Sequence, residues 1–354
     1  MLSSNAHAIT VLPSPPPPPR VLVPRLPRVQ SLADLSGLLS ALERQERPDV
    51  TLPLRDLAMN DDGTIQVPGE GAFALTTWAR RQLSERLGIR WDRWFSNVTD
   101  PERAAEVNLR LSRSSEGVRL RMAEVADPES GRTGAVLRAF VSPRYAPFSD
   151  AMIAGLLAEA LGGTDYAVHR VFYTDMTVSY AVSVGRPFVP GGDAKVGDLQ
   201  GSILVRNSGV GYSSLSVVAY FVRLVCLNGM AVPVKDPVLL AAVHRSAHER
   251  GIRERLAENA SRLGGFLTEG AARLLETRRL PIDNREEVFL EILRRARVPQ
   301  KQLPALETAY TAEPEPTAFG IAQAVTRAAQ LFPSETRFDL ERAASAYITD
   351  GTTV

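Results

Sequence analysis

Residues 118–122 alternate strictly between apolar and basic side chains, reading Val-Arg-Leu-Arg-Met. A period of two is typical of a β-strand that buries one face and exposes the other. A turn-rich connection at residues 127–134 leads into a second apolar segment, residues 135–142, which we interpret as the returning strand. The pair predicts an antiparallel hairpin, so the fold must include a sheet with one apolar face.

The rest of the chain mixes helical and extended patterns. Apolar residues recur at helical spacing in residues 31–47, 76–87, 101–112, 148–161, 239–256, 262–278, 284–297 and 317–331. Short β-rich segments lie at residues 50–57, 64–67, 166–184 and 199–206, and residues 213–227 fit either a strand or a helix. We therefore predict an α+β fold, with an antiparallel β-sheet core, packed helices and a largely helical C-terminal half.

Proline dominates the start of the chain, with five consecutive prolines at residues 15–19. Such a run favours polyproline II and cannot form a helix or a central strand, so residues 1–30 are predicted to be a disordered tail. The patterns divide the remainder into a mostly helical region at 31–115, a β-rich core with an inserted helix at 116–236, and a helical C-terminal region at 237–354.

Composition narrows the classes of function. The 354 residues carry 41 basic and 40 acidic side chains, a net charge of +1, so any nucleic-acid site must be a local patch. Cys226 is the single cysteine, which excludes an intrachain disulfide and fits a reducing cytoplasm. The start lacks the pattern of a signal peptide, and no apolar run is long enough to span a membrane. We expect a cytoplasmic protein.

The common catalytic signatures are missing from the sequence. Gly209-Val210-Gly211 lacks the third glycine of a dinucleotide-binding loop, and Cys226 lies in an apolar run typical of an inert buried thiol. His244 and His248 are four residues apart on a predicted helix, a spacing that can hold a metal. They supply two ligands where a catalytic zinc needs three, and their charged surroundings also fit a solvated helix face. We predict no cofactor, no metal and no enzymatic activity.

Arginine spacing offers a different kind of site. Arg119 and Arg121 share one face of the predicted strand, and on the returning strand Arg138 shares a face with Val136 and Phe140 by parity. A sheet face with several arginines and an aromatic ring suits single-stranded nucleic acid, because guanidinium groups hold phosphates and rings stack on bases. A charged, solvated sheet face explains the same alternation. The candidate residues are Arg119, Arg121, Arg138, Arg144, Tyr145 and Phe140, with Arg206 and Arg223 as further candidates.

Three segments resemble a phage- and plasmid-borne family, domain-of-unknown-function family 932. Residues 137–145 (LRAFVSPRY) are similar to its element before a helix, and residues 207–211 (NSGVG) to its N-S-E-V-G element. Residues 223–230 (RLVCLNGM) resemble its R-hydrophobic-V-C-T-N-G-M element. The resemblance extends from about Asn108 to Ile348 and includes an alanine-rich helix at 318–328. Gly209 and Leu227 depart from the usual Glu and Thr.

The resemblance implies a gene of a mobile element or bacterial genome that lies near replication and recombination functions. Our leading hypothesis is therefore a DNA-associated, homo-oligomeric protein similar in architecture to phage single-strand annealing proteins, which would bind single-stranded DNA and anneal complementary strands. It predicts that Arg119→Ala with Arg121→Ala weakens single-strand binding. Two alternatives are a protein-binding module, such as a host-defence inhibitor or assembly component, and a metal-dependent hydrolase built on His244 and His248. No small-molecule substrate and no membrane partner are predicted.

Overall fold

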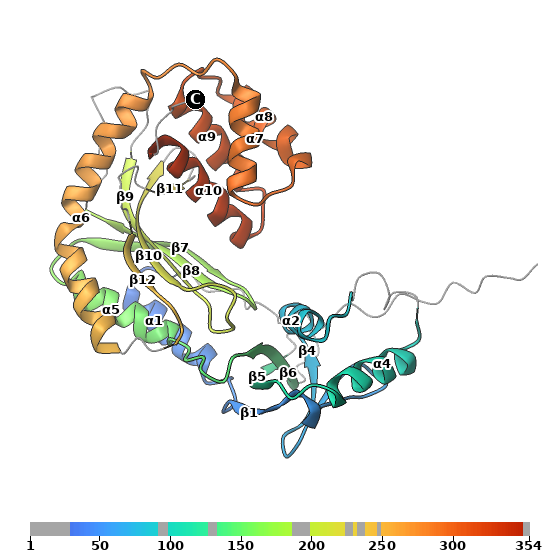
Figure 1. The fold of residues 1–354 in the computed structure, drawn as a ribbon. Coiled ribbons are helices and arrows are strands. Elements are labelled where there is room, and N and C mark those ends of the chain that lie inside the picture. Colours follow the sequence, from blue (N-terminus) through green and yellow to red (C-terminus); the bar gives the residue numbers. More distant parts are fainter. Residues whose placement is uncertain are drawn as a thin grey trace, which may run out of the picture. The chain divides into compact units, whose positions relative to one another are not determined.

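The computed structural model describes residues 29–90, 98–126, 133–185, 199–223, 229–231, 238–245 and 249–349 (Figure 1). The predicted α+β class is confirmed. The chain forms two compact units, one made of residues 44–145 and the other of residues 29–43 with 146–349. These boundaries differ from the predicted regions at 31–115 and 116–236. The reason is that the hairpin of residues 117–141 pairs with strands from residues 50–75 and completes the sheet of the first unit.

The first unit contains a mixed six-stranded sheet in the order β1-β5-β6-β4-β3-β2. Only β4 and β6 run parallel; the other neighbours are antiparallel. The strands are β1 (Val50–Pro53), β2 (Ala58–Met59), β3 (Ile65–Val67), β4 (Gly71–Leu75), β5 (Gly117–Ala126) and β6 (Thr133–Val141). The helices are a 3-10 turn (Leu54–Asp56), α2 (Thr77–Leu87) and α4 (Asp100–Ser112), and they cover a core that includes Phe73, Leu120 and Phe140.

Local signals set the ends of α2, as predicted. The Thr76 hydroxyl accepts a hydrogen bond from the Ala79 amide, and Gly88 follows the last turn with φ of 64°. The strand β4 was not predicted, because the segment 71–75 is short and adjoins the turn at Gly69.

A β-bulge in the hairpin β5–β6 overturns one expectation about faces. Arg121 pairs with Ala139 and Met122 pairs with Leu137, so the register skips Arg138. One extra residue reverses the alternation on the bulged strand. Phe140 therefore pairs with Leu120 on the core face, whereas simple parity had placed its ring beside Arg138.

The second unit is built on an antiparallel sheet in the order β11-β10-β9-β8-β7, with β12 also pairing with β10. The strands are β7 (Tyr166–Tyr173), β8 (Val178–Val184), β9 (Leu199–Asn207), β10 (Leu215–Arg223), β11 (Gly229–Ala231) and β12 (Val238–Ala242). The ambiguous stretch at 213–227 thus includes a strand. Its β-branched residues pack well in a sheet, and β10 pairs with β9 over eight positions.

Helices cover both faces of this sheet. They are α1 (Leu32–Glu43), α5 (Asp150–Ala160), α6 (Glu249–Thr277), α7 (Arg285–Arg295), α8 (Leu303–Ala312), α9 (Ala318–Ala329) and α10 (Ser334–Thr349), with a 3-10 turn at Gln300–Gln302. One sheet face joins α5 and α6 in the main core, and the opposite face, including Leu204 and Tyr220, packs against Phe338 of α10 (Figure 1). None of the helices that the structure describes is both long and apolar enough to cross a membrane.

The predicted helix at residues 239–256 is wrong in its first half. Val238–Ala242 form the strand β12, and α6 begins only at Glu249. Pairing with β10 and burial of Leu239 and Leu240 outweigh the local helix propensity of this leucine- and alanine-rich segment.

Candidate functional site

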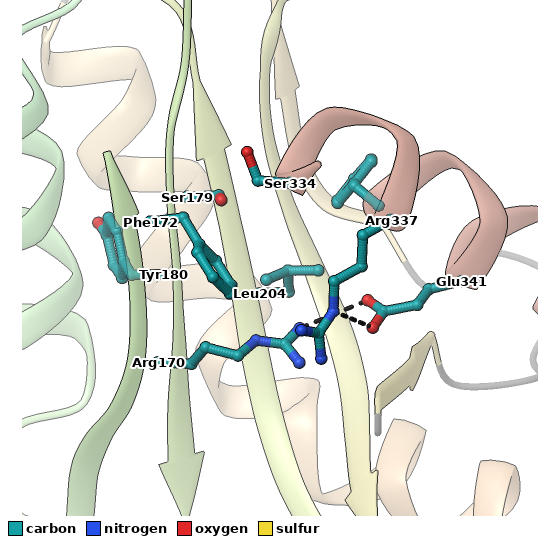
Figure 2. A pocket seen from close by; sticks show the side chains of 9 residues that line it. Arg170, Phe172, Ser179, Tyr180, Leu204, Ser334, Arg337 and Glu341 are labelled. Atoms are coloured by element: carbon teal, nitrogen blue, oxygen red, sulfur yellow. Dashed lines mark hydrogen bonds and ion pairs between the residues drawn. The ribbon is translucent and has the colours of Figure 1, made fainter. Parts of the chain in front are cut away.

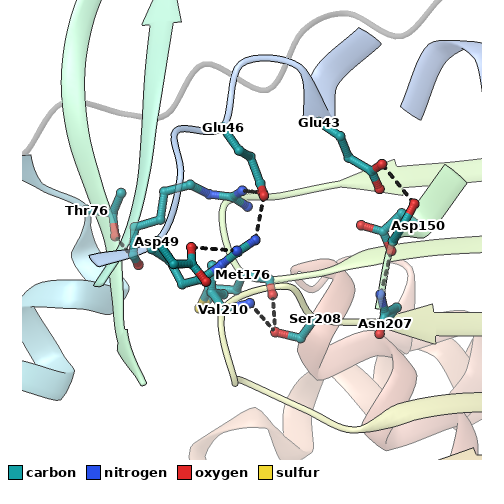
Figure 3. A network of polar contacts seen from close by, with 12 residues as sticks. Glu43, Glu46, Asp49, Thr76, Asp150, Met176, Asn207, Ser208 and Val210 are labelled. Atoms are coloured by element: carbon teal, nitrogen blue, oxygen red, sulfur yellow. Dashed lines mark hydrogen bonds and ion pairs between the residues drawn. The ribbon is translucent and has the colours of Figure 1, made fainter. Parts of the chain in front are cut away.

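Two of the predicted phosphate-binding arginines are neutralised inside the first unit. Arg121 is 8% exposed and donates to the Asp49 carboxylate at 2.8 Å and to the Glu46 carboxylate at 2.5 Å. Arg138, also 8% exposed, donates to the other oxygen of Glu46 (Figure 3). A phosphate would have to break these buried ion pairs, so the expected arginine surface is instead a structural cluster.

The other predicted residues of the first unit also serve the fold. Arg119 is half-buried and donates to the carbonyl of Tyr145 at 2.5 Å. Phe140 is fully buried and Tyr145 is 9% exposed, so neither ring is available to stack on a base. Arg144 alone is exposed.

In the second unit, Arg206 is 6% exposed and pairs with Asp339 at 3.4 Å. Its guanidinium lies 4.5 Å from the ring centroid of Phe338, which ties β9 to α10. The backbone of Arg223 ends β10, and its side chain lies outside the described residues, as does Cys226.

The NSGVG segment anchors the turn between β9 and β10. The Asn207 amide donates to the carbonyl of Phe148 at 3.1 Å and to the Asp150 carboxylate at 2.8 Å (Figure 3). The Ser208 hydroxyl donates to the carbonyl of Met176 at 2.7 Å and accepts from the Tyr212 amide at 2.9 Å. The conspicuous polar turn therefore holds strands and the start of α5 together.

His244 does not lie on a helix, contrary to the prediction. His244 follows β12, is 5% exposed, and places its ring 4.7 Å from that of Phe148. His248 lies outside the described residues. Within the described ranges, no group of three or more histidine, cysteine, aspartate or glutamate side chains has the geometry of a metal site.

A groove with a volume of about 450 Å³ lies between β12 and α6 in the second unit. We call it the β12–α6 groove. Its strand side consists of residues 238–241, and its helix side consists of Arg255, Glu258, Asn259, Arg262 and Phe266. These helix positions recur at intervals of three, four and seven residues, so they share one face of α6.

The two arginines of the groove differ from other arginines on α6. Arg250 and Arg273 each pair with a glutamate four positions away on the helix. Arg255 and Arg262 are exposed and form no ion pair with any residue that the structure describes. The Arg262 guanidinium lies 5.3 Å from the Phe266 ring centroid. Since Glu258 is the single acidic lining residue, the groove carries a net positive charge.

The strand side of the groove presents backbone as well as side chains. The pairing of β12 with β10 steps from Leu240 to Val238, so Leu239 has no partner on β10. The Asn259 amide donates to the Leu239 carbonyl at 2.6 Å. Among the described strands, none pairs with the other edge of β12. An unpaired edge strand beside a helix is the arrangement that accepts an extended peptide.

The sequence contained part of this signal. Residues 255, 259, 262 and 266 have helical spacing and combine arginine with an aromatic residue. The pattern predicted two separate helices at 239–256 and 262–278, so the four positions were divided between two elements. The same prediction assigned residues 239–242 of β12 to a helix.

Comparisons with protein-family models, with curated proteins and with solved structures find no match for this chain.

Proposed function

We propose that this protein is a non-enzymatic binding module that takes up an extended, acidic peptide segment of a partner protein in the β12–α6 groove. The observation that carries the proposal is the coincidence in one groove of a strand edge that no other described strand pairs with, a helix wall, and two arginines that form no ion pair with any described residue. In strand addition, backbone hydrogen bonds supply affinity and side-chain contacts supply specificity.

The groove chemistry favours acidic residues in the partner. Arg255 and Arg262 are seven residues apart, or about 10 Å along the helix axis, which lies between the spacings of about 7 Å and about 13 Å that separate residues i, i+2 and i, i+4 on one face of an extended chain. Carboxylates at that separation would form charge-assisted hydrogen bonds with both guanidinium groups. Apolar side chains of the same peptide would contact Val238, which is 40% exposed.

The test is fluorescence anisotropy of the full chain with a labelled peptide of about ten residues that alternates glutamate and valine. Arg255→Ala with Arg262→Ala should weaken binding by about tenfold or more, the loss of two charge-assisted contacts. The matched control, Arg250→Ala with Arg273→Ala, removes two ion-paired arginines of the same helix that do not line the groove and should leave the affinity unchanged. Equal binding of a lysine–valine peptide, or no effect of the first double variant, would exclude the proposal.

Single-stranded DNA is the second candidate ligand. The observation in its favour is that Arg255, Arg262 and Phe266 combine guanidinium groups with an aromatic ring, the pairing used by single-strand binding proteins. The same anisotropy assay with a labelled oligonucleotide, repeated across a salt series, distinguishes single-stranded DNA from the acidic peptide as the ligand. Salt-sensitive binding that prefers single strands to the acidic peptide and needs Arg255 and Arg262 would replace the peptide proposal.

Association with a mobile element, homo-oligomer formation and strand annealing also stay proposals, because they rest on the three resembling motifs alone. Two of those motifs include residues with structural roles, namely Arg138 and Asn207. Their likeness to the family therefore supports a shared way of folding, and the activity has to be measured separately.

A further inference from the structure

Two arginines share one carboxylate between α10 and the sheet of the second unit (Figure 2). Arg170 on β7 lies 3.4 Å from Glu341, and Arg337 on α10 lies 2.9 Å from the other oxygen of the same carboxylate. The Tyr220 hydroxyl donates to Glu341 at 2.5 Å and accepts from Arg170 at 2.9 Å. Glu341 is 2% exposed, and the side chains of Arg170 and Arg337 are 14% and 12% exposed, so the group is largely buried.

This cluster carries more positive than negative charge. Burial raises the pKa of Tyr220 well above its ordinary value, so its hydroxyl stays neutral. Two guanidinium groups therefore face one carboxylate, and each lies 5.6 Å from the ring centroid of Phe172. The neighbouring acids of α10 are engaged elsewhere: Glu335 accepts from Thr174 and Thr177, and Asp339 pairs with Arg206.

The arginine cluster of the first unit provides a contrast. There Arg121 and Arg138 face two carboxylates, Glu46 and Asp49, and the charges balance. The described residues supply no second acid to the cluster around Glu341, although an unbalanced charge in a largely buried site is costly.

Two nitrogens of Arg170 point to what balances the charge. Its Nε and Nη1 atoms are buried and form no hydrogen bond with any residue in the described part of the chain. Buried donors in folded proteins are nearly always paired, so such a nitrogen commonly marks a bound water or ion. Arg170 lines a cavity of about 10 Å³, together with Phe172, Ser334, Arg337 and Glu341 among others. That volume admits about one water-sized species, which excludes phosphate and carboxylate ligands.

We propose that this cavity binds a single monatomic anion, chloride under physiological conditions, on the guanidinium of Arg170. The anion would complete the charge balance of the Arg170–Glu341–Arg337 cluster and accept from Nε and Nη1. Because α10 supplies Arg337 and Glu341 while β7 supplies Arg170, the bound ion would stabilise the contact of α10 with the sheet.

The test compares thermal unfolding of the full chain in sodium chloride and in sodium gluconate at the same ionic strength. Gluconate is too large for the cavity, and equal ionic strength cancels general screening. Chloride should raise the melting temperature by about 2 °C or more, with saturation, because it binds the folded state alone. Equal melting temperatures in the two salts would overturn the proposal.

Variants locate the effect. Arg170→Met should abolish the difference between chloride and gluconate. Arg206→Met is the matched control, since Arg206 is buried and ion-paired in the same interface but does not line the cavity, and it should keep the difference. A difference that persists in Arg170→Met would contradict the assignment.

A crystal of the unaltered chain grown in bromide gives a readout that needs no variant. Anomalous density beside Nε and Nη1 of Arg170 is the expected result. A peak there without anomalous signal would mean that neutral water fills the cavity, and the anion proposal would be wrong.

Discussion

The side-chain amide of Asn259 donates a 2.6 Å hydrogen bond to the carbonyl of Leu239. The same amide also donates to the Arg255 carbonyl one turn earlier, at 3.0 Å. A single side chain of α6 thus satisfies the backbone group that the irregular pairing of β12 leaves without a partner on β10. This contact joins β12 to α6 through two residues that line the β12–α6 groove.

Replacement of Asn259 by alanine should loosen β12. Loss of the hydrogen bond leaves the Leu239 carbonyl unpaired, at a cost of about 1 kcal/mol in the free energy of unfolding. Asn259→Asp should cost more, because a carboxylate would face the carbonyl oxygen. Hydrogen exchange is the measurement: amides of β12 should exchange faster in both variants while those of β5 keep their wild-type rates. Unchanged exchange in β12 would show that the contact does not hold the strand.

Glu46→Gln should destabilise the first unit. The substitution removes the negative charge that both Arg121 and Arg138 contact and leaves Asp49 as the remaining acid of the cluster. We expect the free energy of unfolding to fall by about 2 kcal/mol. Glu70→Gln is the control: its pair with Arg47 is exposed, with 3.9 Å between the charged atoms, and should contribute less than about 0.5 kcal/mol. Urea denaturation measures both. Similar losses in the two variants would argue against a buried cluster.

Arg121→Ala separates the structural role of this arginine from the DNA-binding role predicted by strand parity. Because Arg121 is buried against Glu46 and Asp49, the variant should unfold at lower urea while the salt dependence of any single-strand binding stays unchanged. A reduced salt slope at wild-type stability would restore the arginine-face hypothesis.

Ionisation of Glu335 should make the free energy of unfolding depend on pH in the acid range. Burial raises the pKa of this carboxyl, but hydrogen bonds from Thr174, the backbone and Thr177 outweigh it and lower the pKa below its ordinary value of 4.5. With the folded-state pKa below the unfolded one, the stabilisation is present above pH 4.5 and is lost as the pH falls through the folded-state value.

Denaturation midpoints measured from about pH 6 to about pH 3 test this. Glu335→Gln should flatten the decline in stability over the acid range. Glu286→Gln, at an exposed position at the start of α7, should follow the wild-type curve. If the denaturation midpoint of Glu335→Gln fell with pH in parallel with that of the wild type, Glu335 would not be the source of the acid dependence.

Two glycines should respond differently to the same substitution. A methyl group at Gly320 would overlap the backbone carbonyl of Glu315, which cannot move without shifting the chain before α9, and we expect a cost of about 3 kcal/mol. At Gly201 the methyl group would lie 2.6 Å from Leu267 Cδ1, the flexible end of a side chain, with a cost of about 1 kcal/mol.

Thermal unfolding of both alanine variants tests this order. Leu267→Ala combined with Gly201→Ala should remove the steric part of the Gly201 cost, so that the two changes are not additive. Additive losses would show that the close approach of α6 to β9 at this point has no energetic effect.

The sequence by itself determined the starts of several helices and the strand pattern at residues 118–122. Thr76, Ser149, Asn284 and Thr317 each accept a hydrogen bond from an amide in the first turn of a helix. The alternation at 118–122 correctly predicted a strand with Val118, Leu120 and Met122 on the core side. Helix caps and hydrophobic periodicity depend on residues that are close together in the sequence. They can therefore be predicted without knowledge of tertiary contacts.

Only the tertiary structure decided where the functional groups lie. Glu46 meets Arg138 across 92 positions of sequence, and the bulge that turns Phe140 into the core exists only once β5 and β6 pair. The segment 238–242 has a helical composition, and it forms a strand because it pairs with β10 and because Leu239 and Leu240 are buried there. Whether an arginine is available for a ligand depends on which carboxylate reaches it, and that is a property of contacts between distant segments, which spacing along the chain does not encode.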